Sequence, residues 1–276
     1  MRKTTEFNPR NRMGENELYD WRGIMMKIIK VKDYEQLSNT AAKFIIERVK
    51  NKPNIVLGLA TGGTPEGTYK NVIQDHQQNG TSYEQVVTFN LDEYIGLPGS
   101  DKNSYRYYMN EHLFNHINVK KENTHIPNGE ASNVKQECED YEGRIQQIGG
   151  IDLQILGIGE NGHIGFNEPG TSFNSRTHVI GLTEETRQAN ARYFPSIEHV
   201  PAHAITMGIG TIMEAKEIIL LASGEKKREA MKKLINGEVT EDFPASILQK
   251  HQNVTIIADE ASLSDVQLSG DGKLDH

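Results

Sequence analysis

Residues 151–169 read IDLQILGIGENGHIGFNEP, an apolar run followed at once by a glycine-rich loop. The run Ile151–Leu156 has the length and aliphatic content of a buried strand. Just beyond it, Asn161, His163 and Glu168 can supply a hydrogen-bond partner, an acid or base, and a carboxyl group. Because ligands of open α/β sheets bind beyond the carboxyl ends of the strands, we interpret this loop as part of an active site.

Two plainer interpretations of the loop exist. Residues 157–162 match the glycine pattern of a dinucleotide-binding turn. That turn must open a long helix, and here Pro169-Gly170 interrupts the chain too early, which disfavours it. A glycine-rich turn with a purely structural role stays open at this point, because glycine marks turns of many kinds.

The rest of the chain alternates strand-like and helix-like segments. Short apolar runs bounded by turn formers predict strands at residues 55–59, 86–89, 151–156, 204–207, 218–222 and 254–258. Helical patterns between them cover about residues 34–50, 66–78, 103–115, 134–147, 184–193 and 225–236. This alternation predicts an α/β fold with a mainly parallel sheet and helices on both faces. A single domain over residues 26–276 is expected, since no Pro- or Ser-rich linker and no internal repeat divides the chain.

Residues 1–25 differ from the remainder. They are polar and lack the apolar stretch of a signal peptide, so we expect a disordered or surface N-terminal arm. A net charge of −8 argues against binding nucleic acid, and no apolar run is long enough to suggest a membrane role. Cys138 is the single cysteine, which excludes an intrachain disulfide and favours a cytoplasmic location.

Further candidate groups follow other predicted strands. In Thr61-Gly62-Gly63-Thr64-Pro65 a strand runs into a glycine turn, with Thr64 expected to cap a helix that starts at Pro65. Free backbone N–H groups at such a helix start favour an anion such as phosphate, although an ordinary capped turn would look the same.

Charged residues complete the candidate set. Asp92 and Glu93 follow the strand at 86–89 and could move a proton or bind a metal, but paired acids are also common in solvated turns. Arg187 and Lys226 could close on a phosphate held by the glycine turn, although most single cations are merely solvated. The chain has no G-x-S-x-G, H-E-x-x-H or C-x-x-C motif, so hydrolase triads of that type and dedicated zinc sites lack a signature, and we expect no metal.

Taken together, Thr61-Gly-Gly-Thr-Pro65, Leu91-Asp-Glu-Tyr94 and Gly162-His-Ile-Gly-Phe-Asn-Glu-Pro169 resemble the glucosamine-6-phosphate deaminase family over about residues 26–262. The resemblance implies a three-layer, Rossmann-like α/β/α fold. It also implies conversion of glucosamine 6-phosphate and water into fructose 6-phosphate and ammonia, without a metal or organic cofactor. Family members are either single-chain or hexameric, so a homo-oligomer is possible.

The resemblance also implies roles for individual residues. Asp92 matches the base that moves the C2 proton toward C1, and His163 matches the ring-opening acid/base, held by Glu168 and Asn161. Residues 61–64, Arg187 and Lys226 match the phosphate site, and residues 178–200 match a mobile lid. Carboxylate neighbours are expected to raise the pKa of His163.

This sequence departs from the family pattern at two places. Asn161 stands where many members have Asp, which leaves Glu168 as the expected partner of the imidazole. Allosterically regulated members carry basic residues after Ser-Arg-Thr, whereas this chain continues with His178-Val179-Ile180. The loss of two cations predicts no activation by N-acetylglucosamine 6-phosphate.

Two other functions fit parts of the pattern. A 6-phosphogluconolactonase would share the fold and a Gly-His loop, but not the Phe-Asn-Glu-Pro that follows His163 here. A non-catalytic sugar-phosphate sensor would need an attached DNA-binding segment, for which the N-terminal arm is too short. Both are disfavoured relative to the deaminase.

Overall fold

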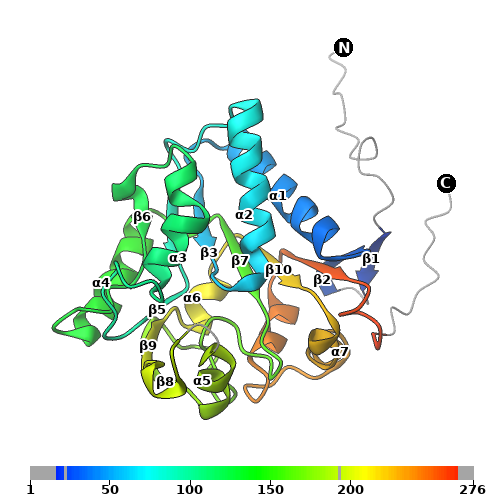
Figure 1. Ribbon diagram of the computed structural model, residues 1–276. Coiled ribbons are helices and arrows are strands. Elements are labelled where there is room, and N and C mark those ends of the chain that lie inside the picture. The colour runs from blue at the N-terminus through cyan, green and yellow to red at the C-terminus, as the bar shows by residue number, and fades with distance from the viewer. Residues whose placement is uncertain (1–16, 22–23, 192–193, 267–276) are drawn as a thin grey trace.

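The computed structural model describes residues 17–21, 24–191 and 194–266. In this part of the chain, eight strands form one sheet in the order β1-β2-β11-β10-β7-β3-β4-β6 (Figure 1). All neighbouring strands are parallel except β1 and β2. The strands are β1 Glu17–Trp21, β2 Ile24–Val31, β3 Val56–Leu59, β4 Val87–Asn90, β6 Thr124–His125, β7 Leu153–Gly157, β10 Glu217–Ala222 and β11 Val254–Asp259.

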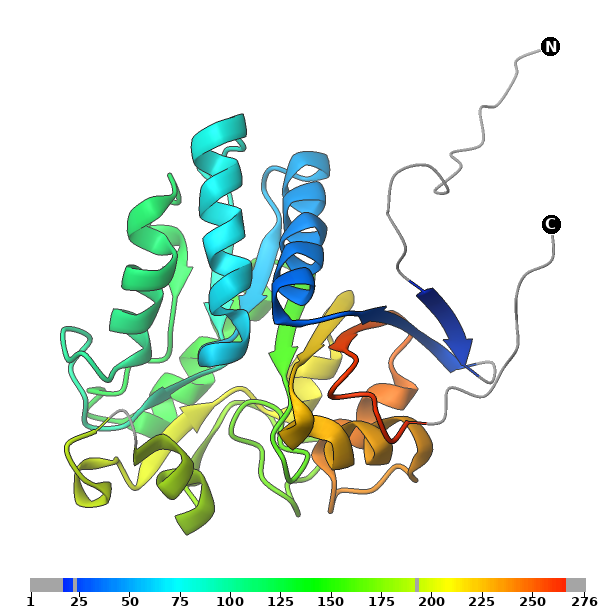
Figure 2. The same ribbon diagram turned by 45° about the vertical axis from the view of Figure 1, so that its right-hand side comes forward.

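Helices cover both faces of this sheet, which confirms the predicted fold class (Figures 1 and 2). One face packs against α1 Tyr34–Asn51, α2 Gly63–Asn79 and α3 Tyr105–His112. The other packs against α4 Val134–Gln147, α6 Ile209–Met213, α7 Arg228–Asn236 and η6 Pro244–Lys250. The remaining short helices are η1 Phe114–His116, η2 Lys121–Asn123, α5 Glu184–Asn190, η4 Ile197–His199 and η5 Glu225–Lys227.

The sheet therefore has an apolar core on each side. In β10, Ile218 and Leu220 belong to the core under α4, α6 and α7, whereas Ile219 and Leu221 belong to the core under α1–α3. Successive side chains of a strand point to opposite faces, so a strand covered on both faces needs an unbroken apolar run. This requirement explains why the central strands were visible in the sequence as continuous runs.

The helix boundaries follow from local capping. The Asp33 side chain accepts a hydrogen bond from the Gln36 backbone N–H at the start of α1, and Asn133 does the same for Gln136 at the start of α4. Such caps satisfy N–H groups that have no partner within the helix. The two helices lie at 34–51 and 134–147, within a residue of the positions predicted from the sequence.

A small antiparallel sheet lies at the carboxyl end of the large one, in the order β5-β9-β8. It consists of β5 Asp92–Tyr94, β8 His178–Gly181 and β9 His203–Thr206. The strand expected at 204–207 is thus present, but it pairs in this sheet and not in the parallel one, a difference from the prediction. Pairing with Asp92–Tyr94 and a hydrogen bond from Met207 N to Leu91 O (2.6 Å) hold it there.

The N-terminal arm and the expected lid can be compared with the prediction only in part. Within the expected N-terminal arm, Glu17–Trp21 forms β1 and pairs antiparallel with β2, so this piece of the arm is an edge strand. Residues 1–16 and 22–23 lie outside the described residues. The expected lid at 178–200 comprises β8, α5 and η4, with residues 192–193 outside the described part; its mobility stays a prediction. Among described residues, no helix combines the length and apolar character needed to cross a membrane.

Candidate active site

Apart from Arg187, which lies on α5, the predicted site residues follow four strands that are neighbours in the large sheet. These strands are β10, β7, β3 and β4, in that spatial order. Because neighbouring parallel strands end at the same edge, the loops after them meet there. The loop after β3 carries the glycine turn at 61–64, β4 leads to Asp92, β7 leads to His163 and Glu168, and β10 leads to Lys226.

The glycine turn differs in detail from the prediction. Helix α2 begins at Gly63 and its N-cap is Gly62, with no side-chain capping hydrogen bond, so Thr64 is not the cap and Pro65 is not the first helical residue. Gly62 has φ +94°, a conformation that costs other residues energy but not glycine. Tyr108 donates its hydroxyl to the Gly62 carbonyl at 2.7 Å, which fixes the turn from α3.

Asp92 is buried beside the loop that carries His163. Its side chain belongs to β5, opposite Thr206 in β9, and the residue is 7% exposed. A Cβ atom placed on Gly165 would lie 3.6 Å from Asp92 Oδ2, which puts this carboxyl against the loop after β7. Burial, reinforced by the neighbouring Glu93, raises the pKa of Asp92 to about 8.

The loop after β7 brings three predicted residues together. Asn161 Nδ2 donates to Glu168 Oε2 at 2.7 Å, and Asn161 Oδ1 accepts from the His163 backbone N–H at 3.1 Å. His163 Nδ1 lies 3.8 Å from Glu168 Oε2, too far for a hydrogen bond but close enough for an electrostatic interaction. Asn161 therefore links the backbone of the histidine to the carboxylate that faces its ring.

A glycine is required where the imidazole lies over the loop. A Cβ on Gly159 would be 2.3 Å from His163 Nδ1, so any other residue at 159 would collide with the ring. The Gly159 N–H also donates to the His163 carbonyl at 2.9 Å. Residues 158–162 contain no helix, and the structure thus gives the glycine pattern a role in seating His163.

The expected rise in the pKa of His163 is wrong. Burial lowers the pKa of the imidazole and outweighs the Glu168 carboxylate, which acts to raise it, while Lys227 lowers it further. The sequence prediction counted the nearby carboxylate but could not include the burial of the ring. His163 is therefore a neutral imidazole at neutral pH, ready to accept a proton.

The two predicted phosphate cations lie on different elements. Arg187, on α5, donates through Nη2 to the carbonyls of Ile197 (3.0 Å) and Val200 (3.2 Å). Its Nε is buried and has no hydrogen-bond partner among the described residues. Lys226 is exposed in η5 at the end of β10. In the described part of the chain, neither cation forms a hydrogen bond with the glycine turn.

One contributor to the site was missed by the sequence reasoning. The Thr186 hydroxyl, on α5, donates to Glu168 Oε1, and Thr186 is buried. No motif in the sequence signals a contact between residues 18 positions apart. Among the described residues, no three His, Cys, Asp or Glu side chains are grouped so that they could hold a metal ion.

Comparisons with known proteins show the family of the chain. Residues 32–257 match the family described as "Glucosamine-6-phosphate isomerases/6-phosphogluconolactonase". A 6-phosphogluconolactonase from Trypanosoma brucei has the same fold at 19% identity, with a TM-score of 0.71 over 87% of this chain and 98% of its own. Fold and family model thus define the class of sugar-phosphate isomerases and lactonases.

Closer relatives narrow the class. The chain is 62% identical to a glucosamine-6-phosphate deaminase of Shouchella clausii, over 87% of this chain and 97% of the relative. It is 54% identical to glucosamine-6-phosphate deaminase 1 of Bacillus subtilis, over 87% and 99%. A solved structure described as a monomeric glucosamine-6-phosphate deaminase superposes with a TM-score of 0.85 at 54% identity, covering 86% and 98%. The chain belongs to the glucosamine-6-phosphate deaminase family.

Proposed function

We infer that this protein is a glucosamine-6-phosphate deaminase, which converts glucosamine 6-phosphate and water into fructose 6-phosphate and ammonia. The observation that supports this function best is the position of the Asp92 carboxyl against Gly165, in the same loop that holds His163 3.8 Å from Glu168. This loop lies at the edge of the sheet where the glycine turn opens α2. The similarity to named deaminases over nearly their whole length supports the same reaction.

The phosphate of the substrate binds at the turn formed by residues 61–64. The first N–H groups of α2 have no partner within the helix and attract an anion. Arg187 and Lys226 supply positive charge from α5 and η5. The buried, unpartnered Nε of Arg187 supports this role, because a phosphate oxygen would give it the acceptor that it lacks.

His163 opens the sugar ring. As a neutral imidazole it takes the proton of the C1 hydroxyl and returns a proton to the ring oxygen, so the pyranose becomes an open-chain aldehyde. Glu168, facing the ring at 3.8 Å, stabilises the imidazolium formed between the two transfers. Asn161 holds the loop in this arrangement through its two hydrogen bonds.

Asp92 then performs the isomerisation. Its carboxylate removes the C2 proton while a proton of the protonated C2 amine passes to O1, which leaves an enol at C1 and an enamine carbon at C2. The same carboxyl group then delivers its proton to C1. The electron pair of nitrogen then forms an iminium ion at C2. Water adds to this carbon, and ammonia leaves as the C2 ketone forms, which gives fructose 6-phosphate. Exclusion of water from the buried Asp92 makes its carboxylate a stronger base than an exposed one.

We also propose that the protein is a cytoplasmic monomer. Cys138, the single cysteine, is buried in α4, and burial raises the pKa of its thiol to about 11, so it has no reactive thiolate. A monomeric deaminase with 54% identity and the same fold supports the oligomeric state.

The function is tested by incubating the purified protein with glucosamine 6-phosphate and measuring ammonia and fructose 6-phosphate together. We expect the two products in equal amounts. Hydrolysis of 6-phosphogluconolactone without release of ammonia would instead identify a lactonase. Binding of sugar phosphates with neither reaction would identify a sensor.

A further inference from the structure

Glu168 is held by two neutral donors that come from different parts of the molecule. One carboxylate oxygen accepts from Asn161, in the same loop, and the other accepts from the hydroxyl of Thr186, in α5. Glu168 is buried, and its carboxylate must keep one orientation to face His163. One of the two hydrogen bonds that orient the Glu168 carboxylate therefore depends on the position of α5.

The direction of the Thr186 hydrogen bond is set by Thr183. The Thr183 hydroxyl accepts from the Thr186 backbone N–H at 3.2 Å, as the cap of α5, and donates its own hydrogen to Thr186 Oγ1 at 3.1 Å. A hydroxyl has one hydrogen to give. Thr186 receives its partner's hydrogen and gives its own to Glu168, so the three groups form one ordered chain.

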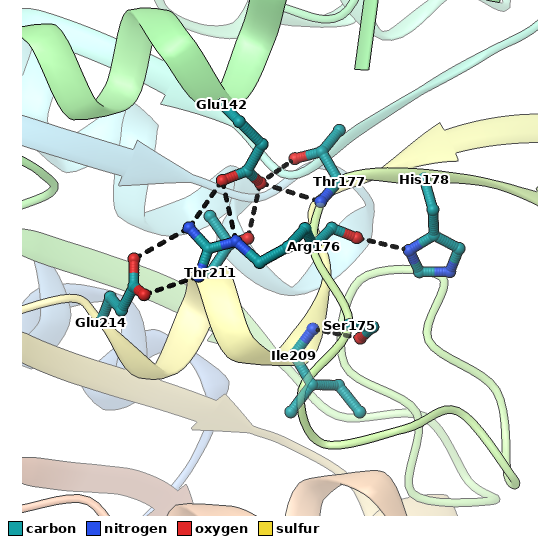
Figure 3. Close-up of polar contacts among 8 residues, drawn as sticks. All are labelled: Glu142, Ser175, Arg176, Thr177, His178, Ile209, Thr211 and Glu214. Atoms are coloured by element: carbon teal, nitrogen blue, oxygen red, sulfur yellow. Dashed lines mark hydrogen bonds and ion pairs between the residues drawn. The ribbon is translucent and has the colours of Figure 1, made fainter. Parts of the chain in front are cut away.

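The segment that leads to α5 is fastened to the body of the protein before it reaches β8. Figure 3 shows the buried carboxylate of Glu142, on α4, at the centre of this attachment. It accepts from Arg176 Nη2 at 2.7 Å and from the backbone N–H of Thr177 at 2.8 Å, and Thr211 of α6 donates its hydroxyl at 2.6 Å. Beyond Thr177 this attachment ends, and the chain continues through β8 into α5.

Next to Thr186 in the sequence is Arg187, one of the proposed phosphate ligands. A rigid helix moves its consecutive residues together, so any shift of α5 that brings Arg187 to a phosphate also changes the position of the Thr186 hydroxyl. Glu168 contacts Thr186, and the proposed phosphate ligand Arg187 is the next residue. The Glu168 carboxylate and the phosphate site are therefore linked through α5.

We propose that Thr186 is a positioning residue that sets the orientation of the Glu168 carboxylate according to the position of α5. This inference rests on the proposed deaminase function. Thr186 acts through Glu168 on His163, and the ring-opening step is fully supported only while α5 keeps the Thr186 hydroxyl against the Glu168 carboxylate, as it does here.

The test compares Thr186→Val, which keeps the shape but removes the hydroxyl, with Thr186→Ser, which keeps the hydroxyl. Both changes are also made in a Glu168→Gln background. Thr88→Val is the matched control: Thr88 is also buried, in β4, and its hydroxyl has no hydrogen-bond partner among the described residues. Ammonia release gives kcat and KM, calorimetry gives the affinity for fructose 6-phosphate, and thermal unfolding reports folding.

We expect Thr186→Val to lower kcat by about tenfold or more, the effect of losing one hydrogen bond to a charged group, with the affinity for fructose 6-phosphate little changed. Thr186→Ser should restore most of kcat, and Thr88→Val should leave kcat unchanged. In the Glu168→Gln background the effect of Thr186→Val should fall to about twofold or less, because coupled residues are not additive.

Three results would overturn the proposal. These are a wild-type kcat in Thr186→Val, a kcat in Thr186→Ser as low as in Thr186→Val, or the same loss of kcat in both backgrounds. Should the unchanged protein release no ammonia, the proposed function fails, and this inference fails with it. The two failures can be told apart. Failure of the proposed function leaves the wild-type protein inactive, whereas failure of this inference alone leaves it active.

Discussion

Two adjacent carboxyl groups, Asp92 and Glu93, show how much the function depends on single residues. Glu93 accepts hydrogen bonds from the backbone N–H groups of Tyr94, Tyr105 and Arg106, each at 2.9 Å, and so anchors the start of α3. Among the described residues, none donates a hydrogen bond to the side-chain carboxyl of Asp92. One carboxyl is therefore structural, and the other is left available for proton transfer.

Asp92→Asn should reduce ammonia release by about a thousandfold or more, since an amide cannot accept the C2 proton and base catalysis supplies factors of this order. Binding of fructose 6-phosphate, measured by calorimetry, should remain. Near-normal turnover in this variant would remove Asp92 as the base.

The same substitution should change stability in a pH-dependent way. The pKa of Asp92 is raised from its ordinary value to about 8, so its contribution to folding is fully present below about pH 4 and is lost as the pH rises through 8. Asp92→Asn should therefore raise the free energy of unfolding by about 4 kcal/mol more at pH 9 than at pH 5. Urea unfolding at the two pH values measures this, and an equal effect at both would contradict the assigned pKa.

Glycine 159 allows a test of how the imidazole is seated. Gly159→Ala places a methyl group in the ring of His163 and should lower kcat by about a hundredfold, the cost of misplacing a catalytic group by about 1 Å. Gly157→Ala is the matched control, because a Cβ there meets no atom within 4 Å. Its ammonia release should stay close to wild type. Equal losses of activity in the two variants would show that the loop needs glycine only for its backbone.

At the scale of elements, prediction from the sequence succeeded where an element is stabilised locally. Helix α4 has a capping residue and an apolar stripe, so its ends were visible, and β11 is buried on both faces and appears as an apolar run. Strand β6, Thr124–His125, has only two residues and is defined by pairing with β4, while β5 carries two acids. Such strands exist because of their neighbours, which periodicity does not reveal.

Arg176 pairs with two carboxylates, the buried Glu142 and the exposed Glu214, so their contributions to stability can be compared. Burial acts to raise the pKa of Glu142, but hydrogen bonds from Thr177, Thr211 and Arg176 outweigh it, and the pKa lies below its usual value. The stability that this provides is present above the ordinary pKa of Glu and is lost as the pH falls through the lowered value. The side chain of Glu214, which binds the same guanidinium, is 63% exposed.

Glu142→Gln should therefore lower the free energy of unfolding by about 2 kcal/mol at pH 7, since it weakens several hydrogen bonds to a buried charge. Glu214→Gln should cost about 0.5 kcal/mol or less, as expected for an exposed ion pair. Urea unfolding at pH 7 and pH 3 measures both, and the deficit of Glu142→Gln should shrink at pH 3. Equal costs for the two variants at pH 7 would show that burial of Glu142 is irrelevant.

At the scale of the whole molecule, the order of strands in space differs from their order in sequence. Strand β7 lies between β10 and β3, and the first parallel strand, β2, pairs with the last, β11. This arrangement places loops from residues near 62, 92, 163 and 226 at one edge of the sheet. The proposed catalytic and phosphate-binding groups are therefore distant in the sequence but follow strands that are neighbours in space.

Kinetics of the intact protein should be simple. The proposed monomer has one active site, and after Thr177 the chain has His178-Val179-Ile180, where the family resemblance implies basic residues in regulated members. The rate should depend hyperbolically on glucosamine 6-phosphate and should not respond to N-acetylglucosamine 6-phosphate, with the mass of one chain in solution. A sigmoidal curve that this compound straightens would contradict both expectations.

The sequence by itself determined the α/β class, the order of most elements and the identity of the candidate site residues, because apolar periodicity, capping and glycine turns are local properties. Only the tertiary structure decided the small antiparallel sheet, the Gly62 cap, the contact of Thr186 with Glu168 and the lowered pKa of His163. Each of these depends on burial or on a partner far away in the chain. Desolvation and long-range pairing are set by the packed molecule, and a pattern along the chain carries no measure of either.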